Sequence, residues 1–293
     1  MEFKEFFSLI RSRVDARLKI KIDSLDNDAA DLKEAMTYGL MLGGKRSRPF
    51  LVYATAKALG LDFSEVDNAA CAVECIHAYS LIHDDMPEMD NDELRRGLPS
   101  VHKKFGQATA LLAGDALQTL AFEFLSDNKN NPCVTIKMVS LLSTLAGYKG
   151  MCGGQAMDLA AEGCAVSLET MQLLHSKKTG ALICASVLMA ASLLDESEST
   201  TYDALHTYAK KVGVAFQIWD DVLDVIGDTS ILGKKAGSDI SLDKSTYPSL
   251  LGLDKARELA IETASEAVEA LDAVASDTSL LREFALFCVQ RDH

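Results

Sequence analysis

The sequence predicts an all-α protein: one large bundle of antiparallel helices with a deep central cavity, formed by residues 1–293 as a single domain. Three observations predict this class. Apolar residues recur three and four positions apart along most of the chain, and the alternation typical of strands is hard to find. The five prolines stand beside residues at which helices end or bend. A chain of this length buries about three quarters of its unfolded surface, so its core needs no disulfides.

The composition excludes several classes of protein. Hydrophobic residues make up 48% of the chain and charged residues 25%, which excludes a disordered tail protein and a collagen-like fibre. The formal net charge of −14 argues against a nucleic-acid binder, because such a protein needs a basic surface. A phosphate-bearing substrate stays compatible with this charge, since bound metal ions invert the local sign.

The expected location is the cytoplasm. The seven cysteines are odd in number and their spacing fits no zinc or disulfide framework, which indicates a reducing compartment. The first residues, MEFKEFFSLIRSRV, contain acids and no continuous apolar stretch, so they are not a secretory signal. The longest apolar stretch, roughly Ala181 to Leu194, is too short to cross a bilayer. We therefore expect no stable membrane insertion.

Long Ala- and Leu-rich segments predict the main helices in order along the chain. The clearest are Ala108–Leu125, Val134–Tyr148 and the apolar stretch that begins at Ala181, all rich in good helix formers with apolar residues on one face. Two short polar segments, Ser126–Pro132 and Asp195–Thr201, separate helices. Because both are short and helical spacing resumes at once, they predict surface turns and not domain linkers.

An apolar helix runs into paired aspartates twice, in LIHDDMPEMD at residues 81–90 and in FQIWDDVLD at residues 216–224. Asp220 and Asp224 lie four positions apart, so a helix places them on one face, where two like charges repel. Pro87 loosens the first segment, and its acids need not keep helical spacing. Neighbouring carboxylates need a cation between them.

Hard oxygen ligands select magnesium over zinc, so the two clusters predict a magnesium site. For either cluster alone, a solvated charged surface is the competing interpretation, and the repetition at the ends of two apolar helices favours the metal. An EF-hand is excluded because its glycine and its terminal glutamate are missing. The candidate metal ligands are Asp84, Asp85, Asp90, Asp220, Asp221 and Asp224.

Compact basic motifs accompany the acids: GGKRSRP at residues 43–49, RRG at 95–97, KTG at 178–180, and the later Lys234 and Lys244. Glycines let the backbone approach a ligand closely, and lysine and arginine complement phosphate. Any one of these cations alone is equally compatible with a surface role. Neither a Walker A motif nor a dinucleotide fingerprint is present. Together, acids, magnesium and cations form a cage for diphosphate beside an apolar interior that suits a hydrocarbon chain.

These motifs together resemble the trans-isoprenyl diphosphate synthases, also called polyprenyl synthetases. The resemblance extends over nearly the whole chain and rests on GGKRSRP, DDMPEMD with its trailing RRG, GDALQTLAF, GGQAMDL, KTG, FQIWDDVLD, GKKAGSD and KSTYP. It implies the all-α isoprenoid synthase fold, a homodimer and three Mg²⁺ ions in each active site. The substrates that it implies are isopentenyl diphosphate and an allylic partner, dimethylallyl or geranyl diphosphate.

The resemblance also implies roles for individual residues. The diphosphate of isopentenyl diphosphate would contact Gly44, Lys45, Arg48, His77 and Arg96. The allylic diphosphate would contact Arg95, Lys178, Thr179, Gln217, Lys234 and Lys244, among which Lys178, Thr179, Gln217 and Lys234 are the candidate catalytic residues. A lone histidine on an apolar helix is more often a core residue, so the role of His77 rests on the family motif. Trp219 is expected to pack beside the site without a catalytic role.

The implied reaction is head-to-tail condensation through an allylic carbocation, with loss of diphosphate and of a proton. Tyr79 and Ser80 precede Asp84 by five and four residues, about one helical turn, and a bulky aromatic there would stop the growing chain. With two extra residues in the first motif, the resemblance implies (2E,6E)-farnesyl diphosphate. Geranyl and geranylgeranyl diphosphate remain alternative products. A non-catalytic subunit of a heteromeric synthase and a terpene cyclase are the other classes considered; the presence of both acidic clusters argues against the first, and GGKRSRP with Arg96 argues against the second.

Overall fold

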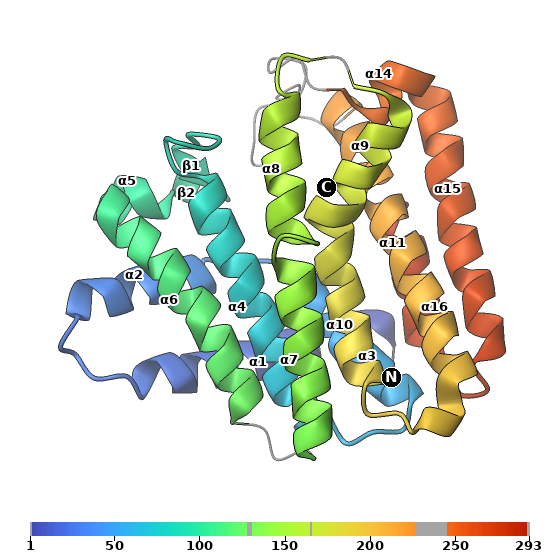
Figure 1. The fold of residues 1–293 in the computed structure, drawn as a ribbon, viewed down its shortest axis with the longest axis horizontal. Helices are drawn as coiled ribbons and strands as arrows, with labels where there is room; N and C mark the ends of the chain where they lie inside the picture. Colours follow the sequence, from blue (N-terminus) through green and yellow to red (C-terminus); the bar gives the residue numbers. More distant parts are fainter. Residues whose placement is uncertain (1, 128–130, 165, 227–244, 292–293) are drawn as a thin grey trace. The chain divides into compact units, whose positions relative to one another are not determined.

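The computed structural model describes residues 2–127, 131–164, 166–226 and 245–291, and within them it is helical almost throughout (Figure 1). The all-α class is confirmed. The chain forms two compact units, the first of Met1–Tyr53 with Asp62–Val139 and the second of Ala54–Leu61 with Ser140–His293. The expectation of one domain over residues 1–293 stays a prediction. Among the described residues, no helix is both long and apolar enough to cross a bilayer.

The first unit is built around α4, Asp67–Asp84, which is buried on nearly all sides. The helix carries small and apolar side chains on most of its faces, so α1, α2 and α6 pack against it from different directions. Residues four apart on α1 form its buried stripe, which runs from Phe6 to Ile22. The elements of this unit are α1 (Phe3–Asp23), α2 (Ala30–Met41), α3 (Ser47–Ala58, which continues into the second unit), η1 (Phe63–Glu65), α4, β1 (Leu94–Arg95), β2 (Leu98–Pro99), α5 (Val101–Phe105), α6 (Gln107–Ser126) and the start of α7 (Pro132–Ala146).

The second unit is organised by α11, Ser199–Ile226, a helix of 28 residues with one strongly apolar face. Helices α10 and α15 pack on it, and α10 is buried along its whole length. The remaining elements are α8 (Met151–Ala161), α9 (Leu168–His175), η2 (Ser176–Gly180), α10 (Ala181–Ala191), η3 (Glu196–Glu198), α14 (Tyr247–Leu251), α15 (Leu253–Ala270), η4 (Leu271–Ala273) and α16 (Ser279–Cys288).

The predicted helices agree with α6, α7 and α10 to within three residues at each end. The polar segment Ser126–Pro132 separates α6 from α7, as expected. The structure adds a two-residue hairpin in which Arg95 pairs with Leu98. Its turn residues, Arg96 and Gly97, have φ of 55° and 76°. Two consecutive positive φ values are the signature of a type I′ turn, and strands this short leave no alternation to detect in the sequence.

Candidate active site

The first aspartate cluster lies at the carboxyl end of α4, which ends at Asp84. The chain then turns at Pro87 and returns, so that the backbone N–H of Asp90 donates to the carbonyl of Asp84 at 2.9 Å. This bond holds the first and last acids of the motif side by side. The Oδ1 atom of Asp90 is buried and accepts no hydrogen bond from any described residue. An orphaned buried carboxylate oxygen is destabilising unless a cation binds it, so this cluster fits a metal ion.

Asp85, between these two acids, has a different environment. It is buried, and its two carboxylate oxygens accept hydrogen bonds from the Arg95 guanidinium, with Nε–Oδ1 and Nε–Oδ2 distances of 2.9 and 3.2 Å. Arg95 Nη2 also donates to Oδ1, so the pair is held by several charge-assisted hydrogen bonds. Arg95 therefore ties the hairpin to the end of α4, and Asp85 is engaged by the protein itself.

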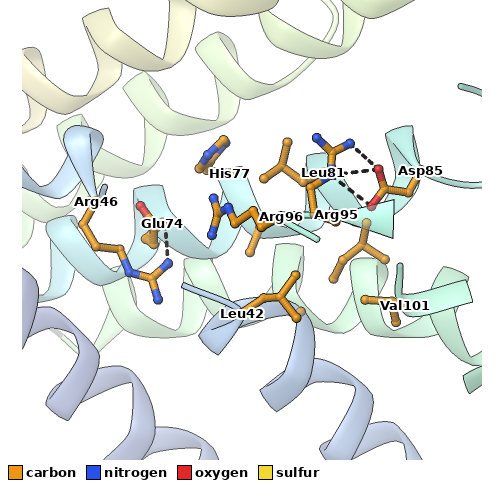
Figure 2. Close-up of a pocket in the computed structure, with 12 residues that line it drawn as sticks. Leu42, Arg46, Glu74, His77, Leu81, Asp85, Arg95, Arg96 and Val101 are labelled. Atoms are coloured by element: carbon orange, nitrogen blue, oxygen red, sulfur yellow. Dashed lines mark hydrogen bonds and ion pairs between the residues drawn. The ribbon is translucent and has the colours of Figure 1, made fainter. Parts of the chain in front are cut away.

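A small pocket opens beside this cluster, within the first unit (Figure 2). His77 and Arg96 point into it, with Arg95 next to them and Glu74 at its other end. The guanidinium of Arg96 lies directly against Gly44: a Cβ atom at Gly44 would come within 2.6 Å of Arg96 Nη1. A side chain at this position would therefore shift the guanidinium, and the hairpin turn and the GGKRSRP motif meet there.

The three cations of GGKRSRP differ in their surroundings. Arg46 is buried, with Nη1 2.6 Å from Glu74, Nε 2.8 Å from Asp15 and Nη2 2.8 Å from the carbonyl of Leu40. These contacts fix α1, α2 and α4 to one another, so Arg46 has a structural role. Lys45 is exposed and Arg48 is half-buried, which leaves these two predicted residues better placed to meet an anion than Arg46.

His77 is electrostatically coupled to this basic pocket. Burial of the ring, followed by the charges of Arg48 and Arg96, lowers the pKa of His77 well below its usual value. The imidazole is therefore neutral near pH 7 in the free protein, and one ring nitrogen can donate a hydrogen bond while the other accepts one. An anion bound near these arginines would offset their charges and favour the protonated ring.

The second aspartate cluster lies near the end of α11. Asp220 and Asp224 are one turn apart, as predicted, and both are partly exposed. Asp221 is buried: Oδ1 accepts from Gln217 Nε2 at 2.9 Å, and Oδ2 accepts from the backbone N–H of Tyr247 at 3.0 Å. Its carboxylate is thus occupied in the same way as that of Asp85.

This bond network continues to the KTG motif. Thr179 Oγ1 donates to Gln217 Oε1 at 2.6 Å, and since Asp221 accepts from the other end of the amide, the orientation of Gln217 is fixed at both ends. Lys178 pairs with Asp158 at 2.7 Å, which positions the ammonium group. Thr179, Gln217 and Asp221 therefore form one chain of hydrogen bonds, as neighbours in space that are 38 and 4 residues apart in sequence.

The KTG residues lie in η2, a single π-helical turn between α9 and α10. Such turns widen the helix and are frequent at functional sites. Two glycines allow its neighbours to approach: a Cβ at Gly154 of α8 would lie 2.2 Å from the backbone nitrogen of Lys178, and a Cβ at Gly213 of α11 would lie 2.8 Å from Gly180 Cα. The close contact from α8 and α11 holds the wide turn in place.

Other predicted residues are less closely connected to these groups. Tyr79 is buried, and its ring packs edge-on against His83 with centroids 5.7 Å apart. The hydroxyl of Ser80 donates to the carbonyl of His77 at 2.9 Å. Lys234 and Lys244 lie outside the described residues.

Within the described ranges, no three histidines, cysteines or acids gather closely enough to hold a metal alone. This is compatible with Mg²⁺, because that ion binds one or two carboxylates together with substrate phosphates.

Comparison with known proteins decides the family. The model of the polyprenyl synthetase family matches residues 29–280. The chain belongs to the polyprenyl synthetase family. It is 48% identical to the farnesyl diphosphate synthase of Escherichia coli over the full length of both chains, and 44% identical to the chloroplastic geranylgeranyl pyrophosphate synthase of Capsicum annuum, over 82% of this chain and 66% of that one. A geranyltransferase structure from Helicobacter pylori, complexed with magnesium and isoprenyl diphosphate, has a TM-score of 0.82 at 34% identity and covers 97% of this chain and 96% of that one.

As a polyprenyl synthetase with bacterial farnesyl diphosphate synthases at 40–48% identity among its relatives, the protein is a short-chain prenyltransferase. The predicted family, fold class and enzyme class are confirmed. Its substrates are isoprenyl diphosphates, consistent with the family. The motifs did not reveal the internal partners: Glu74 for Arg46, Arg95 for Asp85, Asp158 for Lys178 and Tyr247 for Asp221. Only Asp158 could have been suspected from the sequence, because it is the acid within the GGQAMDL motif.

Proposed function

We propose that the enzyme condenses dimethylallyl diphosphate, and then geranyl diphosphate, with isopentenyl diphosphate to give (2E,6E)-farnesyl diphosphate. The observation that carries this proposal is the structure at the end of α4. There, a basic pocket formed by His77, Arg95 and Arg96 adjoins a carboxylate cluster in which Asp90 has an orphaned buried oxygen. An anion site next to a cation site suits a substrate that binds as a metal diphosphate.

Each of the two clusters contains one buried acid, whereas its other acids are more exposed. Asp85 and Asp221 are buried and their oxygens accept hydrogen bonds from protein groups. We therefore assign metal binding to Asp84, Asp90, Asp220 and Asp224, and orientation of the clusters to the two buried acids. When bound, magnesium neutralises the diphosphate oxygens and favours departure of the leaving group. Three ions per site, as the family resemblance implies, are part of this proposal.

The protein's own residues would perform the remaining tasks. Lys45, Arg48, His77 and Arg96, approached by the backbone at Gly44, hold isopentenyl diphosphate. Arg95, Lys178, Lys234 and Lys244 hold the allylic diphosphate and stabilise the negative charge that develops on it as the allylic C–O bond breaks. Thr179 and Gln217, fixed by Asp221, lie near the reacting carbons. The double bond of isopentenyl diphosphate then attacks the allylic cation, and the proton lost from its C2 passes to the released diphosphate.

The product length follows from Tyr79, whose buried ring lies about one helical turn before Asp84. Relatives of this chain include farnesyl and geranylgeranyl synthases at similar identity, so identity alone does not select the product. The test is incubation with dimethylallyl and isopentenyl diphosphates, with and without Mg²⁺, followed by chain-length analysis. We expect a fifteen-carbon product from the wild type and longer products from Tyr79→Ala. The control, Tyr148→Ala, truncates an exposed tyrosine and should change nothing.

Two outcomes would contradict the proposal in different ways. Absence of any product in the presence of Mg²⁺ would remove the proposed reaction. A Tyr79→Ala variant that makes nothing longer than the wild type would leave the reaction intact but refute Tyr79 as the residue that limits the chain.

The homodimer and the cytoplasmic location stay predictions. Two adjacent exposed leucines on α6, Leu111 and Leu112, support a subunit interface at this helix. Sedimentation velocity of the wild type and of Leu112→Glu tests this, because a charge within an apolar interface should favour the monomer.

A further inference from the structure

The segment that follows α16 docks on α11 beside the second aspartate cluster. The side chain of Arg291 is only 8% exposed, and its Nη2 atom lies 2.5 Å from Oδ1 of Asp220. The same Nη2 atom donates to the carbonyl of Phe216 at 3.1 Å, and Nε donates to the carbonyl of Cys288 at 3.1 Å. A residue 71 positions away in sequence thus contacts the first acid of the cluster.

Arg291 is also held by contacts that do not involve Asp220. Its guanidinium carbon lies 3.9 Å from the centroid of the Phe216 ring, a cation–π contact. Its carbonyl accepts a hydrogen bond from the indole N–H of Trp219 at 2.9 Å. These contacts anchor both the backbone and the side chain of Arg291, so its guanidinium is held in position independently of Asp220. Trp219, expected only to pack beside the site, is one of these anchors.

We infer that Arg291 is a positioning residue of the second metal cluster, which fixes Oδ1 of Asp220 and thereby sets the direction in which the other oxygen meets the ion. This inference rests on the proposed function, in which Asp220 binds magnesium. Carboxylates that bind metals are commonly oriented by a hydrogen-bond donor behind them, and loss of such a donor weakens metal binding.

A competing arrangement is that Arg291 only substitutes for the metal and leaves when the ion arrives. Burial argues against it, because an arginine released from Asp220 would keep its charge in a nearly dry position over Phe216 without a carboxylate. The two arrangements predict opposite signs: removal of Arg291 weakens metal binding if it orients Asp220 and strengthens metal binding if it competes.

The test is binding of Mn²⁺ in the presence of inorganic diphosphate, with free Mn²⁺ measured by electron paramagnetic resonance. Trp219, the only tryptophan in the chain, supplies a second readout by fluorescence quenching. We expect Arg291→Gln to bind Mn²⁺ about tenfold more weakly than the wild type. The matched control, Arg282→Gln on α16, removes a partly exposed arginine paired with Asp272 at 2.7 Å and should leave the Mn²⁺ affinity unchanged. The Arg291→Gln enzyme should need a higher Mg²⁺ concentration for half-maximal activity than the wild type, with a similar turnover once Mg²⁺ is saturating.

Unchanged or tighter Mn²⁺ binding by Arg291→Gln would overturn the inference. If that variant does not fold, Trp219→Phe removes an anchor of residue 291 without a change of charge, and its affinity, read by resonance alone, should fall in the same direction; an unchanged value overturns the inference equally. Asp220→Asn separates this from the proposed function: if the wild type and Asp220→Asn bind Mn²⁺ alike, the metal site itself is refuted.

Discussion

Replacement of Asp221 by asparagine tests whether this acid supports the site from behind or binds the metal. The carboxylate accepts two hydrogen bonds, one from Gln217 Nε2 at 2.9 Å and one from the backbone N–H of Tyr247 at 3.0 Å. Asparagine keeps one oxygen and replaces the other by an NH₂ group. Whichever way the new amide turns, one of the two donors then faces another donor.

The expected effect follows from burial, since Asp221 is 3% exposed and water has little access to the mismatch. An unsatisfied buried donor costs about 1–3 kcal/mol, so the free energy of unfolding should fall by that amount. Rotation of the Gln217 amide would relieve one mismatch, but it would reverse the hydrogen bond with Thr179. Turnover should therefore fall through loss of the Thr179–Gln217 geometry as well.

Asp224→Asn is the matched control because it removes the same charge from the same helix at a partly exposed position. Without metal, its free energy of unfolding should fall by less than that of Asp221→Asn, because water can solvate groups at a partly exposed position. Urea unfolding in EDTA measures both variants, and activity against Mg²⁺ concentration follows. Equal destabilisation by the two substitutions, or a neutral Asp221→Asn, would refute the assigned difference in role.

Two further predictions concern the basic pocket. Gly44→Ala should raise the KM for isopentenyl diphosphate, because the added Cβ would displace the Arg96 guanidinium. Gly43→Ala is the control, since Gly43 also has a positive φ (96°) but a Cβ there meets nothing within 4 Å. Equal kinetics of the two variants would contradict the displacement of Arg96. The lowered pKa of His77 means that the unfolded chain binds an extra proton below about pH 6.5, so acid destabilises the fold. His77→Gln should therefore lose up to about 1 kcal/mol less stability than the wild type between pH 6.5 and 5.5 in urea unfolding, and identical pH profiles would contradict this.

The sequence predicted the helices and the chemistry-bearing motifs because both depend on local patterns. Apolar spacing located α6, α7 and α10, and the acids four apart correctly placed Asp220 and Asp224 on one face. The partners of these groups come from distant segments and leave no local pattern. Tyr247 is 26 residues from Asp221, and Arg291 is 71 residues from Asp220. Such contacts depend on how the helices pack, so only the structure reveals them.

The GGKRSRP motif shows the same limit at short range. Three cations within four residues are chemically similar, and spacing alone does not say which one meets a ligand. The burial of Glu74 on α4 explains why Arg46 points into the protein. A buried carboxylate without a partner is costly, and Arg46 pairs with Glu74 at 2.6 Å. Arg46 adopts a left-handed backbone, with φ of 52°, in doing so. The family resemblance passed over Arg46, and the structure supplies the physical reason.

Both clusters contain adjacent aspartates, and helix geometry accounts for the pairing. Consecutive residues on a helix point about 100° apart, so when an apolar helix ends in two acids, one can face a ligand while the other faces the protein. The inward acid then needs its own donor, which is Arg95 for Asp85 and the pair of Gln217 and Tyr247 for Asp221. Because Arg95 and Gln217 are also predicted to contact the allylic substrate, we expect the inward acids to couple metal binding to substrate binding. Loss of an inward acid should therefore disturb both, whereas loss of an outward acid should disturb the metal first.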